Sequence, residues 1–155
     1  MRHRWFRDSR EAMNAAEDEA SNSNCNSRHL GTVVVDIEGV LVSTGYNYTL
    51  DAICMLGVCH KKFEGVKEGP SDFCQAMHSE EMAAKKVMAL ERMGRGLKRP
   101  LTAICAMGHP CGECLAHLRA ADIKRLVLQK DMFYTPHDKE LWDELYKDFF
   151  QVEIL

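Results

Sequence analysis

The sequence predicts an α/β protein, a three-layer α/β/α sandwich built around a mixed central sheet of about five strands. Short runs rich in valine, isoleucine and leucine recur along the chain, as in residues 31–35, 101–107 and 123–129. Segments with apolar residues at helical spacing stand before and between these runs. Strands that alternate with helices are typical of a sheet whose two faces are both covered by helices.

The first half of the chain predicts one helix, two paired strands and an insertion. A helix is expected over residues 4–19, with an apolar face formed by Trp5, Phe6, Met13 and Ala16. In residues 31–47, β-branched runs flank an acidic residue and a glycine, which predicts two strands joined by a tight turn at 37–39. Residues 51–74 hold cysteines around a middle that carries glycine and lysine, and predict a loop-rich insertion.

The second half predicts three helices alternating with three strands. The first helix covers residues 75–93, and its expected buried side consists of Met77, Ala84, Val87, Met88 and Leu90. The remaining elements are, in order, a strand at 101–107, a helix at 111–121, a strand at 123–129, a helix at 137–149 with Trp142, Leu145 and Phe149 inward, and a strand at 151–155.

Composition indicates a single domain, residues 1–155, that forms an ordinary globular core. A chain of this length buries roughly two-thirds of its unfolded surface, and its apolar fraction of 46% and charged fraction of 28% are typical of globular proteins. The net charge of −3 gives no electrostatic reason to expect a nucleic-acid partner or a membrane surface.

The start of the chain and its cysteines predict a cytoplasmic protein. Residues 1–20 mix both charge signs and lack the apolar core of an export signal. No apolar run approaches the ~20 residues needed to cross a bilayer. The seven cysteines, an odd number, cannot all pair within the chain. We therefore expect metal ligands or buried thiols rather than disulfides.

Two short motifs at the starts of predicted helices supply a set of metal ligands. Cys111 and Cys114 are three residues apart, so on a helix their sulfurs lie on one face. The positive field of a helix N-terminus favours the thiolates that a metal requires. His78 completes a Cys₂His set. Three protein ligands leave the fourth tetrahedral position open, which is typical of a catalytic zinc.

Glu80, two residues after His78, is the predicted catalytic group. On a helix its side chain points away from the direction of His78, so it need not bind the same ion. Zinc held by two thiolates is nearly neutral and is a weakened Lewis acid. A carboxylate that removes a proton from water and delivers it to a leaving amine is then needed. Hydrolytic deamination of an aminated base requires such a proton carrier.

These motifs, His78-x-Glu80 and Pro110-Cys111-x-x-Cys114, resemble the signature of zinc-dependent base deaminases. From about Cys25 to Leu128 the chain is similar to the cytidine and deoxycytidylate deaminase superfamily. The resemblance implies a zinc enzyme that hydrolyses the 4-amino group of a cytosine nucleotide. Ser79 stands where the family usually has alanine; as another small residue it should be tolerated.

Within that superfamily the chain looks most similar to deoxycytidylate (dCMP) deaminases. A GTVVVD strand is followed by Thr44-Gly45-Tyr46-Asn47, like the paired strands that end in Gly-Tyr-Asn in that group. The resemblance implies conversion of dCMP to dUMP and ammonia by a homo-oligomer, with Asn47 on the sugar or phosphate and Arg28 on the phosphate. Tyr48-Thr49-Leu50 replaces a segment that serves triphosphate regulation in some relatives, which leaves control by dCTP or dTTP without support.

Several alternatives remain open on the sequence alone. Cys54, Cys59, His60 and Cys74 could bind a second, structural zinc, or be plain thiols. Asn47 could be an ordinary turn residue. The substrate could be cytidine, deoxycytidine or a modified nucleoside, whereas Glu113 before the last cysteine disfavours the tRNA adenosine type. A non-catalytic zinc-binding interaction domain, with Cys74, Cys105 or His109 as fourth ligand, would need the metal but not Glu80.

Overall fold

The computed structural model describes residues 4–57, 59, 76–130, 144 and 146–155. Five strands form one sheet in the order β2-β1-β3-β4-β5. Their bounds are β1 Gly31–Val35, β2 Leu41–Tyr46, β3 Leu101–Ala106, β4 Ile123–Leu128 and β5 Gln151–Ile154. β1 is antiparallel to both β2 and β3, while β3, β4 and β5 are parallel. The predicted mixed sheet is confirmed.

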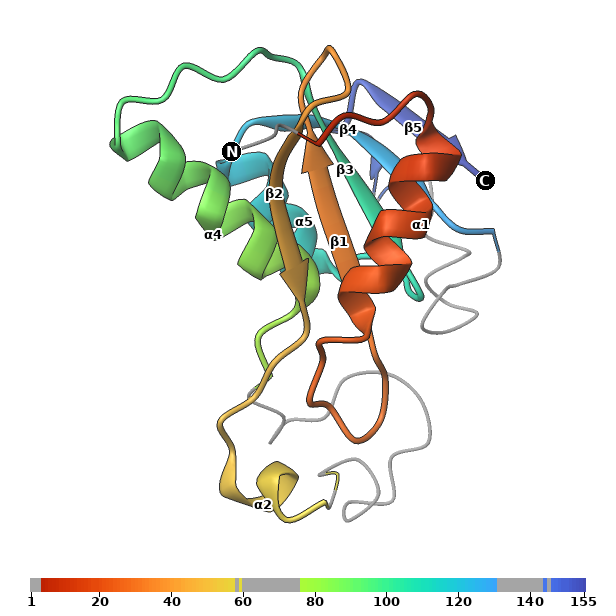
Figure 1. Cartoon of the computed structure of the whole chain (residues 1–155), viewed down its shortest axis with the longest axis vertical. Helices are drawn as coiled ribbons and strands as arrows, with labels where there is room; N and C mark the ends of the chain where they lie inside the picture. Colours follow the sequence, from red (N-terminus) through yellow and green to blue (C-terminus); the bar gives the residue numbers. More distant parts are fainter. Residues whose placement is uncertain (1–3, 58, 60–75, 131–143, 145) are drawn as a thin grey trace.

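Helices cover both faces of this sheet (Figure 1). One face carries α1 (Ser9–Ala20), and the other carries α4 (Ser79–Arg92) and α5 (Gly112–Ala120), which also pack against each other. A short helix, α2 (Ala52–Met55), lies away from the sheet. The three layers predicted from the sequence are therefore present. None of the described helices is long and apolar enough to span a membrane.

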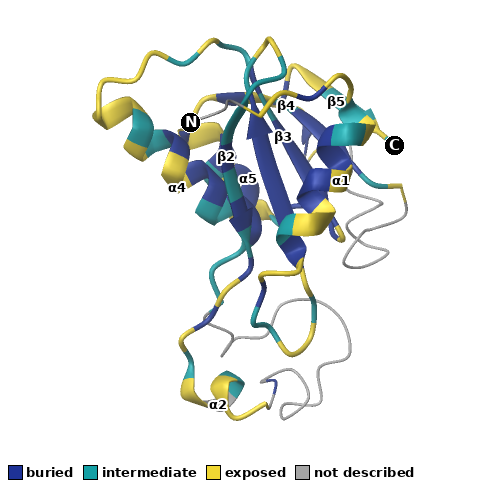
Figure 2. Ribbon diagram, in the orientation of Figure 1, coloured by how far each residue is buried: buried dark blue, intermediate teal, exposed yellow. Residues whose placement is uncertain are grey.

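Alternating side chains on β1 show why both faces need a cover. Val33 and Val35 pack with α1, whereas Val34 between them packs with α4 and α5. Successive side chains of a strand point to opposite faces, so the uninterrupted apolar run buries every residue of β1 (Figure 2). The same division continues across the sheet, since Ile104 contacts the α1 side and Cys105 the opposite side.

The first helix begins later than the sequence pattern predicts. α1 begins at Ser9, because the Asp8 carboxylate caps it by accepting a 2.9 Å hydrogen bond from the Glu11 amide. The preceding residues are extended: Trp5 pairs with Val40 in an isolated bridge, and the Phe6 amide donates to the Gly39 carbonyl. The prediction of helix from residue 4 was therefore wrong, and Phe6 reaches the core from extended backbone.

The predicted tight turn between β1 and β2 is present. One carboxylate oxygen of Asp36 accepts from the amides of Glu38 at 2.8 Å and Val40 at 3.0 Å. Gly39 has a φ of 82°, a value that side chains disfavour.

The helix predicted over 75–93 begins at Ser79 and ends at Arg92. His78 is its N-cap with extended backbone, and Met77 pairs with Tyr48 instead of joining the helix. Ala84 and Val87 are buried as predicted, and Met88 and Leu90 are half-buried.

Three asparagines fasten the chain at the end of the molecule that carries α2. The Asn24 side chain makes two hydrogen bonds with the backbone of Thr49, and the side-chain amide of Asn26 donates to the Cys54 carbonyl. Asn47 bonds to the segment before β1 in the same way. Most of the predicted insertion lies outside the described residues, as does most of the helix predicted at 137–149. The strand predicted at 151–155 is present as β5.

Candidate metal centre and active site

The helices α4 and α5 begin side by side, and each begins with a candidate ligand. His78 is the N-cap of α4 and Cys111 is the N-cap of α5. Neither side chain caps its own helix, although this is the usual function of an N-cap side chain. Both instead point to a shared cluster with Cys114, which lies in the first turn of α5.

The three donor atoms converge closely enough for one ion. His78 Nδ1 lies 3.0 Å from Cys114 Sγ and 3.5 Å from Cys111 Sγ, and the two sulfurs are 3.3 Å apart. Zinc bonds of about 2.3 Å to sulfur and about 2.0 Å to nitrogen place tetrahedral donors roughly 3.5–3.8 Å apart. An opening of a few tenths of an ångström would fit the ion, and the imidazole and sulfur donors are the ligands that zinc prefers.

The two cysteines share a proton that a cation can replace. The pKa of Cys111 is lowered to about 4, chiefly by a hydrogen bond with the Cys114 thiol. The pKa of Cys114 is raised through the same contact and by burial. The hydrogen bond with Cys111 also raises the pKa of His78. One sulfur is therefore a thiolate beside a protonated thiol, and a divalent cation would displace that proton.

Glu80 lies beside this cluster with its carboxylate out of water. Its side chain is 1% exposed, and burial raises its pKa. One carboxylate oxygen accepts a 3.1 Å hydrogen bond from the Ser79 hydroxyl. A buried carboxyl group with a raised pKa is suited to taking up and releasing a proton.

The other residues offered as a fourth ligand are engaged elsewhere. Cys105 is buried against Thr32, its cross-strand neighbour, and burial raises its pKa well above that of a free thiol. His109 Nε2 bonds to the Gln129 carbonyl at 2.5 Å, and its Nδ1 faces the Tyr146 hydroxyl. Among the described residues, only His78, Cys111 and Cys114 bring three ligand atoms together. Cys74 lies outside the described residues.

The two predicted substrate residues, Asn47 and Arg28, are joined by a hydrogen bond. Asn47 is buried; its amide oxygen accepts from the Leu30 amide and its nitrogen donates to the Arg28 carbonyl, both at 2.7 Å. Arg28 is half-buried on the segment that Asn47 holds. Tyr48, the residue after Asn47, pairs with Met77, the residue before His78. Asn47 and His78 are therefore near one another in the folded chain. The substrate contacts of Asn47 and Arg28 stay predictions.

The possible second metal site stays a prediction as well. Cys59 is buried and Cys54 is half-buried. His60 and Cys74, the other two proposed ligands, lie outside the described residues.

Sequence reasoning missed Thr32, which is fully buried behind Glu80. Its hydroxyl bonds to the Ser79 hydroxyl at 2.9 Å. The available signal was a threonine at an inward position of an otherwise valine-rich strand, where an unpaired hydroxyl would be costly.

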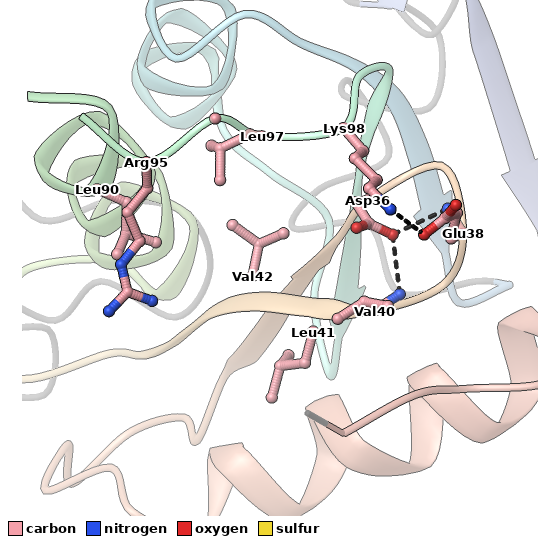
Figure 3. A pocket seen from close by; sticks show the side chains of 10 residues that line it. Asp36, Glu38, Val40, Leu41, Val42, Leu90, Arg95, Leu97 and Lys98 are labelled. Atoms are coloured by element: carbon pink, nitrogen blue, oxygen red, sulfur yellow. Dashed lines mark hydrogen bonds and ion pairs between the residues drawn. The ribbon is translucent and has the colours of Figure 1, made fainter. Parts of the chain in front are cut away.

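Two grooves along the outer edge of β2 are separate from this cluster. One of them is lined by Leu41, Val42, Leu97 and several charged side chains (Figure 3). There the Asp36 carboxylate bonds to backbone amides, and Lys98 pairs with Glu38 at 2.8 Å. The second groove shares Leu41 and Val42 with the first. Neither groove contains His78, Glu80 or the two cysteines.

Comparisons with known proteins agree with this geometry. The family model described as the cytidine and deoxycytidylate deaminase zinc-binding region matches residues 7–130. The dCMP deaminase of cyanophage S-TIM5, in its apo form, superposes with a TM-score of 0.58 at 19% identity, covering 95% of this chain and 96% of that one. The structure of that enzyme with dCMP and dUMP gives the same TM-score and identity over 92% and 93%. No curated protein sequence matches the chain.

Proposed function

The chain belongs to the cytidine and deoxycytidylate deaminase family, and from that premise we propose that it hydrolyses dCMP to dUMP and ammonia. As a family member it is a zinc-dependent deaminase. The observation that carries the proposal is the buried Glu80 carboxylate beside a converged set of one imidazole and two sulfurs. A purely structural zinc site has no use for such a carboxylate.

His78, Cys111 and Cys114 are the proposed zinc ligands. Zinc, when bound, supplies the Lewis acidity that makes a water molecule acidic near neutral pH. The three side chains come from the starts of α4 and α5, two helices that pack on the same sheet, so the fold brings the ligands together. That arrangement limits the cost of ordering the ligands.

Glu80 is the proposed proton carrier. A carboxylate oxygen of Glu80 accepts a proton from the attacking water and passes it to N3 of the cytosine ring, while the water oxygen bonds to C4 and the C4=N3 double bond becomes single. The same carboxylate then takes the remaining proton from the new hydroxyl and delivers it to the 4-amino nitrogen, so that the C4–N bond breaks as C4=O forms. The sum is water consumed, one amino group replaced by oxygen and one ammonia released. Burial raises the pKa of this carboxyl group, which makes it a better proton acceptor than an exposed glutamate.

Arg28 and Asn47 are proposed to select the nucleotide. A guanidinium is suited to a phosphate, and Asn47 fixes the backbone of the segment that carries it. The dCMP and dUMP bound by the S-TIM5 enzyme support a nucleotide substrate. The family resemblance further supports a homo-oligomer.

The test is ammonia release from a panel of cytosine, adenine and guanine nucleosides and nucleotides. Loss of a charge-assisted phosphate contact of ~1.5–3 kcal/mol predicts that kcat/KM falls roughly 10- to 150-fold from dCMP to deoxycytidine. Arg28→Ala should lower turnover of dCMP and barely change the rate on deoxycytidine. Equal rates on the two compounds would overturn the nucleotide assignment and leave a nucleoside deaminase.

A further inference from the structure

A chain of buried hydroxyl groups runs from the centre of the sheet to Glu80. Thr32 lies on β1 and Ser79 at the first position of α4, and the exposed fraction of each is at most 1%. Their hydroxyl oxygens are 2.9 Å apart, and Ser79 Oγ is 3.1 Å from Glu80 Oε2. Ser79, whose side chain hydrogen-bonds to the Glu80 carboxylate, is therefore itself linked to the sheet.

Gly45 makes this approach possible. In the sheet Gly45 is the cross-strand neighbour of Thr32. A Cβ atom at Gly45 would lie 2.0 Å from the Ser79 carbonyl oxygen, closer than any real contact. The missing side chain therefore lets the first turn of α4 rest on the sheet, where the short side chain of Ser79 can reach Thr32.

Counting protons fixes the direction of the hydrogen bonds. Ser79 donates its single hydroxyl proton to the Glu80 carboxylate. The oxygen of Ser79 must then accept from Thr32. The two hydroxyls are in series, and each depends on the other for its orientation.

We propose that Thr32 and Ser79 are positioning residues that hold the Glu80 carboxylate in its reactive orientation. This rests on the proposed deaminase function. The serine stands where the family motif usually has alanine, and its hydroxyl group supplies the link between the sheet and the carboxylate. Because proton transfer depends on placement within fractions of an ångström, a loosened carboxylate lowers the rate without weakening substrate binding.

The test compares Thr32→Val, Ser79→Ala, the double variant and Thr32→Ser with a matched control, Ser43→Ala. Ser43 is also a buried hydroxyl that joins the sheet to α4, donating to the Ala83 carbonyl at 2.9 Å, but it does not touch Glu80. Each variant is loaded with zinc, assayed on dCMP or on the substrate that the panel identifies, and crystallised to locate the Glu80 side chain.

We expect Thr32→Val and Ser79→Ala to lower kcat roughly tenfold with KM within about twofold of the original value. Zinc content should not change. The double variant should be no slower than Ser79→Ala, because the groups act in series, and Thr32→Ser should restore the rate. Ser43→Ala should lower thermal stability and leave kcat unchanged.

The proposal is overturned if Thr32→Val has the kcat of Ser43→Ala, or if the losses of Thr32→Val and Ser79→Ala multiply in the double variant. It is also overturned if Glu80 occupies the same position in Ser79→Ala as in the original protein. If no compound in the panel is deaminated, the proposed function fails, and the position of Glu80 in the crystals still decides the positioning role.

Discussion

The two faces of the central sheet bury different kinds of groups. Under α1 the buried side chains are apolar, and they include Phe6, Met13, Val33, Ile104 and Val127. Under the first turns of α4 and α5 the apolar core gives way to Thr32, Ser79, Glu80, Cys111 and Cys114. Buried polar groups cost free energy unless each finds a partner. Both faces therefore stabilise the fold through apolar packing, but only the face under α4 and α5 also holds buried polar groups suited to catalysis.

We expect the largest effect when a proposed cysteine ligand is removed from the face under α4 and α5. Cys114→Ala should abolish stoichiometric zinc binding and activity and also lower stability, because the folding of a metal site and the binding of its ion are coupled. Metal analysis of protein never exposed to chelator checks this. Full zinc content in this variant would show that the ion is held elsewhere.

Substitution of two glycines, Gly31 under α1 and Gly45 under α4, tests the two faces of the sheet separately. A Cβ at Gly31 would lie 1.9 Å from the Ala16 carbonyl on α1, just as a Cβ at Gly45 would clash with Ser79 on α4. Gly31→Ala and Gly45→Ala should therefore each cost about 1–3 kcal/mol or more of unfolding free energy in urea. Only Gly45→Ala should also lower kcat of the folded, zinc-loaded protein, since it displaces the turn that carries Glu80. Equal losses of kcat would contradict this.

We expect the smallest effect from a substitution on the face of the sheet that α1 covers. Ile104→Val removes one methylene group under α1 and should cost about 0.5–1.5 kcal/mol of unfolding free energy. Its kcat and KM should match those of the original protein, because Ile104 points away from the site. A kcat reduced severalfold in this variant would mean that the two faces are not independent.

The sequence could predict the features that depend on local pattern. The apolar runs located the strands to within one or two residues, and the spacing of Cys111 and Cys114 indicated a metal site before any contact was known. Helix starts were harder, because apolar side chains such as Trp5 and Phe6 suit extended backbone as well as a helix. There, the Asp8 cap decides where α1 begins.

Contacts between distant segments could not be predicted in the same way. Thr32 and Ser79 are 47 residues apart, and their hydrogen bond depends on the close approach that Gly45 permits. The resemblance to dCMP deaminases implied a substrate role for Asn47. In the structure its amide bonds to the backbone at Arg28 and Leu30, which a sequence pattern does not reveal.

In the proposed mechanism Glu80 carries protons while other residues hold the metal, and the Glu80→Gln variant separates these two functions. Glutamine keeps the size of the side chain and a hydrogen-bonding group but cannot carry the proton. Deamination of dCMP should fall by at least ~10²-fold, within the range for positioned acid–base groups, while zinc content and thermal stability stay close to those of the original protein. A fully active, zinc-loaded Glu80→Gln variant would contradict the account.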